Sequence, residues 1–391
     1  MARKRIVVKI GSSLLTDQTR LTPRWGFMQR IMEDFALLRD QGYDVLLCSS
    51  GSVALGMKMM GVTPEDAGLR DKQASAACGM PLLLNAYKQI GHEYDLNIAQ
   101  ILVTLGDFEI HSRFLNTKNT LVRLLEAGVV PIINENDTIT TEEIRVGDND
   151  RLAAKVAQMV LAEHLIILTS VDGLYDQDPS NPDAKLVEEV QDVSQYLSVT
   201  EGVSTLGSGG MLTKLQAANM AQNSGCHTII ANGEADSPIS SALFGQRPRT
   251  ICPAHSEPLA TWHAWLSERL HIAGSIVVNS AAADAIDAGE RGVHREDVIR
   301  IEGSYHKGDV IHIYDEDGKE RARGMSDFTS EETEILVRNL NIPVKQLLGY
   351  HSRAVLVEHN NLTTLDERHL PWQRPEPAKQ AKFEPFPNET R

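Results

Sequence analysis

The sequence has no hydrophobic run that approaches the roughly 18 residues of a membrane helix. It begins MARKRIVVKIG, which lacks the apolar core of a signal peptide and predicts a strand from the start. We therefore expect a cytoplasmic protein, with neither a membrane span nor a secretory leader.

Cysteine is scarce. Only four occur, and none of their spacings is typical of metal ligands (Cys48, Cys78, Cys226 and Cys252). Cys48 lies in an apolar, strand-like run, which favours a thiol packed in the core. Scattered, unpaired cysteines are typical of proteins in a reducing compartment.

Positive charge is also in deficit: 38 Lys and Arg stand against 53 Asp and Glu, for a net charge of −15. Nonspecific nucleic-acid binding depends on neutralising phosphates, so this balance argues against it. Small anions are not excluded, because a few lysines can create a local positive field. The 391 residues, 42% of them hydrophobic, suffice for two or three domains with a sizeable core.

Apolar strand patterns alternate with helical patterns through about residue 250. The expected strands are residues 5–10, 43–48, 98–104, 128–133, 165–169 and 228–231. The expected helices include 22–40, with Pro23 in its first turn, as well as 71–94, 114–127, 151–162 and 211–223. This alternation predicts an α/β fold, a mainly parallel sheet sandwiched by helices.

The pattern changes after Cys252-Pro253. A helix at 261–270 precedes short strands separated by turns, at 275–278, 298–301, 310–314, 321–325 and 354–357. We expect an α/β domain over residues 1–255, a linker over 256–273 and a small β-rich barrel domain over 274–358. Residues 359–391 end in a stretch rich in Pro, Glu, Lys and Gln, which predicts a disordered tail.

The stretch Asn134–Asp150, NENDTITTEEIRVGDND, follows a buried strand pattern. It therefore lies at the carboxyl end of a strand, where open α/β sheets bind ligands. It contains six carboxylates, three asparagines and one arginine. A solvated loop could carry these charges, but the short acid and amide groups clustered at its two ends suit a ligand with an ammonium group.

Four other segments follow strands or precede helices and could contact anions: KIGSS at 9–13, SSGS at 49–52, LTSVDGLY at 168–175 and GSGGMLTK at 207–214. Each has an ordinary alternative, respectively a solvent-facing lysine, a helix cap, a plain turn and a flexible linker. Together, two lysines on glycine-rich loops indicate phosphoryl transfer between anionic groups. A carboxylate acceptor, with a reference pKa of about 4, is already ionised at pH 7 and needs no general base.

These residues resemble the glutamate 5-kinase family of the amino acid kinase superfamily. The resemblance rests on VKIGSS, SSGSVALG, FLNTKNTLVRLLEAGVVPIINENDT, GDND, LTSVDGLYDQDP and GSGGMLTKLQAA, in collinear order over about residues 4–255. GSIVVN and YHKGDVIHIYDEDGKERARG are similar to a PUA domain. The pairing of NEND with VGDND is specific, because related aspartate and N-acetylglutamate kinases lack it.

The resemblance implies that the γ-phosphate of ATP, with Mg²⁺, is transferred to the γ-carboxylate of L-glutamate. The residues implied to be catalytic are Lys9, Asp150 and Lys214. The residues implied to bind glutamate are Ser50, Asn134, Asp137, Asp148 and Asn149. The residues implied to bind ATP are Lys9, Thr169, Ser170, Ser208, Gly209, Gly210, Met211, Leu212, Thr213 and Lys214. The family also implies a homo-oligomer, a dimer or tetramer, with proline as feedback inhibitor.

The sequence departs from the family pattern at three places. Ser170 stands where Asp is common, Arg145 stands where Lys is common, and residues 260–265 lack the basic residues often seen before a tryptophan. Two alternatives stay open: another amino acid kinase with a different acceptor, or an RNA-binding regulator that uses the PUA-like region. Residues 274–358 contain 16 acidic and 10 basic residues, a net charge of −6, so RNA binding is not expected.

Overall fold

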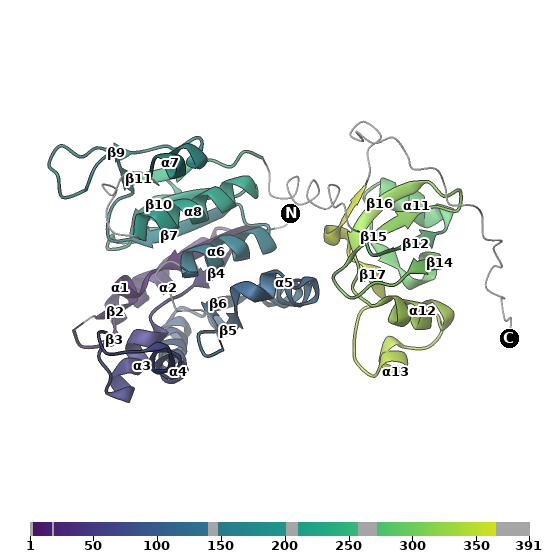
Figure 1. The fold of residues 1–391 in the computed structure, drawn as a ribbon, viewed down its shortest axis with the longest axis horizontal. Coiled ribbons are helices and arrows are strands. Elements are labelled where there is room, and N and C mark those ends of the chain that lie inside the picture. The colour runs from purple at the N-terminus through teal and green to yellow at the C-terminus, as the bar shows by residue number, and fades with distance from the viewer. Residues whose placement is uncertain (1–2, 18, 140–147, 201–209, 257–271, 365–391) are drawn as a thin grey trace. The chain divides into compact units, whose positions relative to one another are not determined.

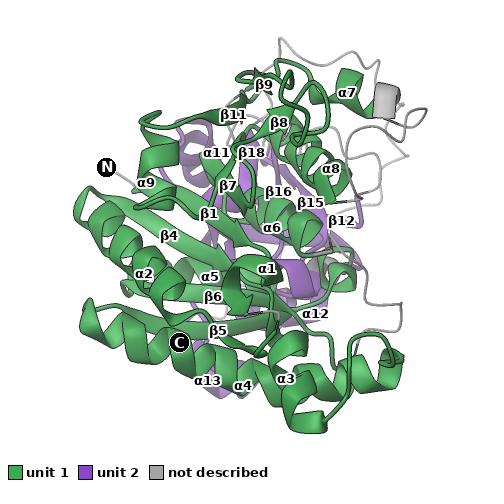
Figure 2. Cartoon of the chain, turned by 90° about the vertical axis from the view of Figure 1, so that its left-hand side faces the viewer, with its two compact units in different colours: residues 1–110, 116–261 green, residues 111–115, 262–391 purple. Residues whose placement is uncertain are grey.

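The computed structural model describes residues 3–17, 19–139, 148–200, 210–256 and 272–364. The protein chain forms two compact units (Figure 2). One comprises residues 1–110 and 116–261, and the other residues 111–115 and 262–391. None of the helices in the described ranges is long and apolar enough to cross a membrane.

The first unit is built on a seven-stranded sheet, which confirms the predicted α/β fold (Figure 1). Its strands in chain order are β1 (Lys4–Ile10), β4 (Tyr43–Cys48), β5 (Asn97–Val103), β6 (Val129–Glu135), β7 (His164–Thr169), β10 (His227–Asn232) and β11 (Arg249–Cys252). Their order across the sheet is β11-β10-β7-β1-β4-β6-β5. All neighbours pair in parallel except β10 and β11. β1 is thus central, with the carboxyl ends of β4 and β7 on either side of its own.

Helices cover both faces of this sheet. They are α1 (Ser12–Leu15), α2 (Trp25–Asp40), α3 (Ser52–Met60), α4 (Leu69–Glu93), α5 (His111–Glu126), α6 (Asp148–Met159), α7 (Val193–Thr200), α8 (Gly210–Asn223) and α9 (Pro238–Leu243). Smaller elements are β2 (Thr16–Asp17), β3 (Thr22–Pro23), η1 (Leu105–Phe108), β8 (Leu174–Tyr175) and β9 (Leu186–Val187). Ile6, Val8 and Ile10 of β1 pack in one core with α2. Alternate residues of a strand face opposite ways, so Lys9 faces the other side of the sheet.

The helices α2, α4, α5, α6 and α8 begin one to three residues away from the predicted positions, and two of these differences change how a segment is interpreted. The predicted helix from Thr22 begins instead at Trp25, because Thr22–Pro23 pairs with Thr16–Asp17 in a small hairpin. Proline is tolerated in such an edge strand as well as in a first helical turn, and the pattern alone did not distinguish the two. In the other case, α6 begins at Asp148, three residues before the predicted Arg151. The acidic residues of GDND therefore form the first turn of a helix.

Helices α3 and α4 approach closely at two glycines. A Cβ added to Gly79 would lie 1.8 Å from the carbonyl oxygen of Ser52, and one added to Gly56 would lie 1.7 Å from that of Ser75. Real atoms never come so near, so both positions require glycine. Because Ser52 begins α3 directly after the Ser49–Gly51 segment, this contact also determines where that segment lies.

We expect Gly79→Ala to destabilise the protein by about 3 kcal/mol or more, because the added methyl group must push the two helix backbones apart. The matched control is Gly26→Ala in α2, where a Cβ would meet nothing within 4 Å. That change should leave stability unchanged or raise it slightly. Thermal unfolding of the two variants beside the wild type tests this. Equal melting temperatures for the two variants would contradict the close approach.

The amino-terminal ends of β7 and β10 place two histidines side by side. His164 and His227 are register partners whose ring centroids lie 5.3 Å apart. Within the described residues, the buried Nδ1 of His164 has no hydrogen-bond partner. Burial lowers the pKa of His164 to about 4, against the opposing charge of Glu163. His164 is thus held neutral in the folded protein at neutral pH.

Acidification should therefore destabilise this unit. An unfolded histidine has a pKa of about 6.5, so between pH 6.5 and about 4 the unfolded state binds the proton first. The contribution of His164 to this loss is on the order of 3 kcal/mol, complete by about pH 4. Melting temperatures measured across this range should fall less steeply for His164→Leu than for the wild type. The exposed His92, changed to Leu, is the control and should keep the wild-type slope.

The second unit has its own five-stranded sheet, which confirms the expected β-rich domain. Its strands are β12 (Gly274–Val278), β14 (Val298–Gly303), β15 (Val310–Tyr314), β16 (Glu320–Met325) and β18 (Leu362–Thr364), in the order β14-β12-β15-β16-β18. β13 (Val293–His294) pairs with β17 (Val355–Val357). The remaining elements are α11 (Ser280–Asp287), α12 (Ser330–Arg338), α13 (Val344–Leu348), η2 (Arg295–Asp297) and η3 (His359–Asn361).

Here the sequence prediction was incomplete. The three helices were not predicted, and the sheet continues past residue 358, because Leu362–Thr364 pairs with β16. This last strand has only three residues, too few for a recognisable alternation. The predicted helix at 261–270 lies outside the described residues.

Candidate active site

A cleft of about 1070 Å³ opens at the carboxyl ends of the central strands. Parallel strands end at the same edge of a sheet, so segments distant in the sequence meet here. The described residues that line the cleft come mainly from the ends of β1, β4, β6 and β7 and from the starts of α3, α4, α6 and α8. They include Lys9, Ser12, Ser50, Ser52, Pro64, Lys72, Glu135, Asp137, Asn149, Asp150, Thr169, Ser170, Tyr175, Asp178, Gly210, Met211 and Lys214.

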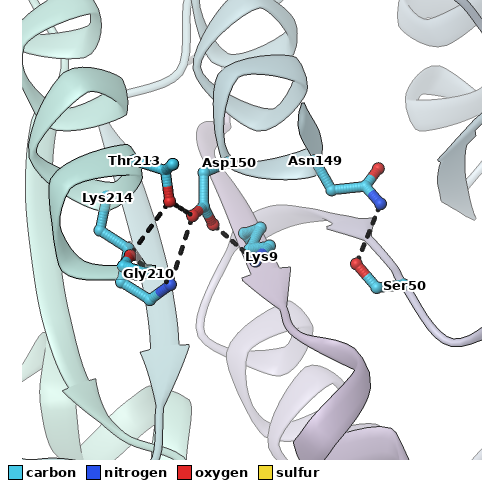
Figure 3. Close-up of polar contacts among 7 residues, drawn as sticks. All are labelled: Lys9, Ser50, Asn149, Asp150, Gly210, Thr213 and Lys214. Atoms are coloured by element: carbon cyan, nitrogen blue, oxygen red, sulfur yellow. Dashed lines mark hydrogen bonds and ion pairs between the residues drawn. The ribbon is translucent and has the colours of Figure 1, made fainter. Parts of the chain in front are cut away.

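At the middle of the cleft, Asp150 binds two lysines (Figure 3). Its Oδ1 lies 2.5 Å from Nζ of Lys9, and its Oδ2 lies 3.2 Å from Nζ of Lys214. The hydroxyl of Thr213 donates to the same Oδ2 at 2.8 Å. Lys214 also donates to the carbonyl oxygen of Gly210 at 3.1 Å. One carboxylate thus positions two ammonium groups that come from opposite ends of the domain sequence.

Local structure explains how these side chains converge. Lys9 is next to last in β1, on the face of the sheet that α6 covers. Asp150 is the third residue of α6, and Lys214 is the fifth residue of α8, which packs against α6. Each group is therefore held by a regular element rather than by a long loop.

The pKa values of Lys9 and Asp150 are both lowered, for different reasons. Burial lowers the pKa of Lys9, which is only partly offset by the attraction of Asp150. Burial alone would raise the pKa of Asp150, but the charges of Lys9 and Lys214 outweigh it and hold that pKa below its usual range. Asp150 is therefore ionised at neutral pH. With both lysines protonated, the cluster carries one net positive charge, which favours a phosphate group.

The residues expected to bind glutamate are mostly on one side of this cluster. Nδ2 of Asn149 donates to Oγ of Ser50 at 3.0 Å, and Asp137 is buried in the cleft wall. Asn134 is buried at the end of β6, where its Nδ2 donates to Oγ of Ser52 at 3.4 Å, and it does not line the cleft. Asp148 begins α6, but its side chain lies outside the described part.

The residues expected to bind ATP are mostly on the other side. Thr169, Ser170, Gly210 and Met211 line the cleft beside Lys214. Two expected residues on α8 do not: Thr213 binds Asp150, and Leu212 is among the exposed apolar side chains. Ser208 and Gly209 lie outside the described residues. Arg145 and most of the stretch between the two acidic clusters also lie outside them.

Three charged residues in the cleft wall are not among the predicted site residues: Glu135, Lys72 and Asp178. Glu135 is buried there and accepts a hydrogen bond from the amide of Leu105 at 3.4 Å. Its place in the acidic stretch could have indicated it. Lys72 lines the cleft from α4, and no pattern in the sequence around it separates it from an ordinary surface lysine.

The described residues offer no cluster of three or more His, Cys, Asp or Glu that could hold a metal ion. Both carboxylate oxygens of Asp150 bind lysines. A Mg²⁺ ion commonly binds through substrate phosphates and water with one or two carboxylates, so these residues fit an ion that arrives with a nucleotide.

Comparison with known proteins places the chain in a family. The model of the amino acid kinase family matches residues 4–232, and that of the PUA domain matches residues 274–348. Glutamate 5-kinase of Rhodospirillum rubrum is 39% identical over 365 residues, covering 93% of this chain and 96% of that protein. Glutamate 5-kinase of a Ruegeria species is 40% identical, covering 92% and 98%.

Among solved structures, carbamate kinase from Giardia lamblia bound to AMP-PNP covers 65% of this chain and 99% of that one, with 18% identity and a TM-score of 0.47. The family assignment depends on the sequence matches, which span both units. By these matches, the chain belongs to the glutamate 5-kinases of the amino acid kinase family.

Proposed function

We propose that this protein transfers the γ-phosphoryl group of ATP to the γ-carboxylate of L-glutamate, forming L-glutamyl 5-phosphate and ADP in the first step of proline biosynthesis. The observation that carries the proposal is the pair of lysines held by Asp150 in the cleft, 2.5 Å and 3.2 Å from its two oxygens. The relatives of this protein that are named glutamate 5-kinase support glutamate as the acceptor.

In the reaction, an oxygen of the acceptor carboxylate attacks the γ-phosphorus. The new O–P bond forms as the bond from that phosphorus to the β,γ-bridging oxygen breaks, and the electron pair stays on ADP. The acceptor is already ionised, so no base is needed. The barrier is electrostatic, because two anions approach and a third leaves. Lys9 and Lys214 stabilise this developing charge, and Asp150 orients them.

The two sides of the cleft suit the two substrates. Ser50, Asn149 and the buried Asp137 surround the acceptor side, and a carboxylate such as Asp137 suits the ammonium group of glutamate. Thr169, Ser170 and the start of α8 suit ATP, with backbone amides at a helix terminus facing phosphates. Mg²⁺, bound to the ATP phosphates, would supply further neutralisation of charge.

The test is formation of a hydroxamate when purified protein is given ATP, glutamate and hydroxylamine, which traps acyl phosphates. We expect hydroxamate that depends on both ATP and glutamate. Hydroxamate with aspartate or N-acetylglutamate but none with glutamate would overturn the proposed acceptor.

The role of Asp137 predicts a specific kinetic defect. Asp137→Asn should raise the KM for glutamate roughly 10- to 100-fold, because a charged hydrogen bond is lost, with a smaller effect on kcat. The exposed Asp183, changed to Asn, is the control and should keep wild-type constants. An unchanged KM for glutamate in Asp137→Asn would remove this residue from the pocket.

Three further features belong to this proposal. We expect the protein to act in the cytoplasm, to be inhibited by proline and to form a dimer or tetramer. Proline inhibition is tested by adding proline to the hydroxamate assay. The oligomeric state is tested by measuring the mass of the protein in solution.

A further inference from the structure

Lys72 lies in the wall of the cleft without a role in the phosphoryl transfer described above. It is the fourth residue of α4, half-buried, and lines the cleft together with Pro64. Within the described residues, its ammonium group makes no hydrogen bond or ion pair. The positive end of the helix dipole disfavours a lysine this near a helix start. Its position is therefore better explained by a negative ligand than by local stability.

The charges along the cleft support this view. The lysines among its described lining residues are Lys9, Lys72 and Lys214. Two of these bind Asp150 at the centre. Lys72 remains as a cation available to a second anionic group.

The strand order indicates which substrate that group belongs to. β4, which leads into α3, and β7, which leads into the Thr169–Asp178 segment, lie on opposite sides of β1. α4 packs against α3 through Gly79 and Ser52, so the start of α4 lies on the β4 side of the sheet (Figure 2). Lys72, the fourth residue of α4, therefore lines the cleft from that side. That side also contains Ser50 and Asn149, whereas α8, whose start is proposed to bind the ATP phosphates, lies on the β7 side.

We propose that Lys72 binds the α-carboxylate of glutamate and so selects an amino acid with two carboxylates. This inference rests on the proposed function. Glutamate carries one ammonium and two carboxylates, and the γ-carboxylate must face the lysines at Asp150 in order to react. Asp137 suits the ammonium group, which leaves the α-carboxylate in need of a cation.

The test compares Lys72→Met with Lys88→Met, which removes an exposed lysine from the same helix. We expect Lys72→Met to raise the KM for glutamate roughly 10- to 100-fold while the KM for ATP and kcat change little. Lys88→Met should behave as the wild type. Lys72→Arg, which keeps the charge, should recover part of the affinity.

A second substrate separates the α-carboxylate from other anions. 4-Aminobutyrate keeps the amino group and the reacting carboxylate but lacks the α-carboxylate. Its affinity, measured by inhibition of the glutamate reaction or by ADP release, should be the same in Lys72→Met as in the wild type. If Lys72→Met lost affinity for glutamate and for 4-aminobutyrate equally, or had a higher KM for ATP, Lys72 would be assigned to the phosphates and the inference would be overturned.

The two proposals fail in different ways. A wild-type protein that makes no hydroxamate with glutamate would remove the proposed function. A wild-type protein that is active, with an unchanged glutamate KM in a Lys72→Met variant of normal melting temperature, would remove only the role of Lys72.

Discussion

Lys214→Ala should lower kcat by roughly 10²- to 10³-fold and change the KM for glutamate and ATP far less. The ammonium group of Lys214 lies 3.2 Å from Asp150 in the cleft. In the proposed mechanism it meets the charge that develops on the transferred phosphoryl group. Interactions that strengthen only in the transition state appear in kcat rather than in KM. Steady-state ADP release measured against each substrate in turn checks this split.

The control for this change is Lys88→Ala, which removes an exposed lysine outside the cleft and should leave kcat intact. Lys214→Arg keeps the charge but not the shape of the ammonium group, so an intermediate kcat is expected. A variant in which only KM rises would show that Lys214 binds the ground state and would contradict its assignment to the transition state.

Asp150→Ala should both abolish measurable activity and destabilise the α/β unit by about 3–5 kcal/mol, since it leaves a buried charge without its partner. The Asp150 side chain is 1% exposed and that of Lys9 is 6% exposed, so water cannot replace the lost contact. Asp150→Asn should lose similar stability, because it keeps the shape but not the charge. The exposed Asp183, changed to Asn, is the control.

The stability of Asp150→Ala should also rise with pH. Burial already lowers the pKa of Lys9, and removing Asp150 removes the main charge that opposes this. An unfolded lysine keeps a pKa of about 10.4, so as pH rises towards this value the unfolded state holds more protons than the folded one. Urea unfolding of the variant at pH 7 and pH 9.5 measures the difference. If Asp150→Ala were as stable as Asp183→Asn at pH 7, Asp150 would not be needed to neutralise the charges of Lys9 and Lys214.

Much of the sheet followed from periodicity. β4 begins and ends at the predicted residues, and β1, β7 and β10 differ from prediction by a residue or so at either end, because buried parallel strands form continuous apolar runs. Two of the misses share a cause. Thr22–Pro23 and the first residues of α6 are short polar segments. The local preferences of such segments suit a turn, a strand edge or a helix start equally well. Tertiary contacts select among these alternatives.

The candidate site was also predicted in part from the sequence. Lysines, glycines and short acids at strand ends marked where Lys9, Asp150 and Lys214 would lie, because residue chemistry is visible in the sequence. Their functional roles stay a prediction. Thr213 illustrates the limit, because its place in GSGGMLTK suggested a nucleotide contact, whereas in the fold its hydroxyl donates to Asp150.

The sequence by itself determined an acidic α/β chain with the residue types of a phosphoryl transferase, because periodicity and composition are local properties. Only the tertiary structure gave the distances at which Asp150 contacts the two lysines from β1 and α8, and only it showed that Lys72 lines the same cleft from α4. Those distances depend on how β1, α6 and α8 pack and on the close contact of α3 with α4 at Gly79. Such packing joins residues far apart in the chain, and no local pattern encodes it.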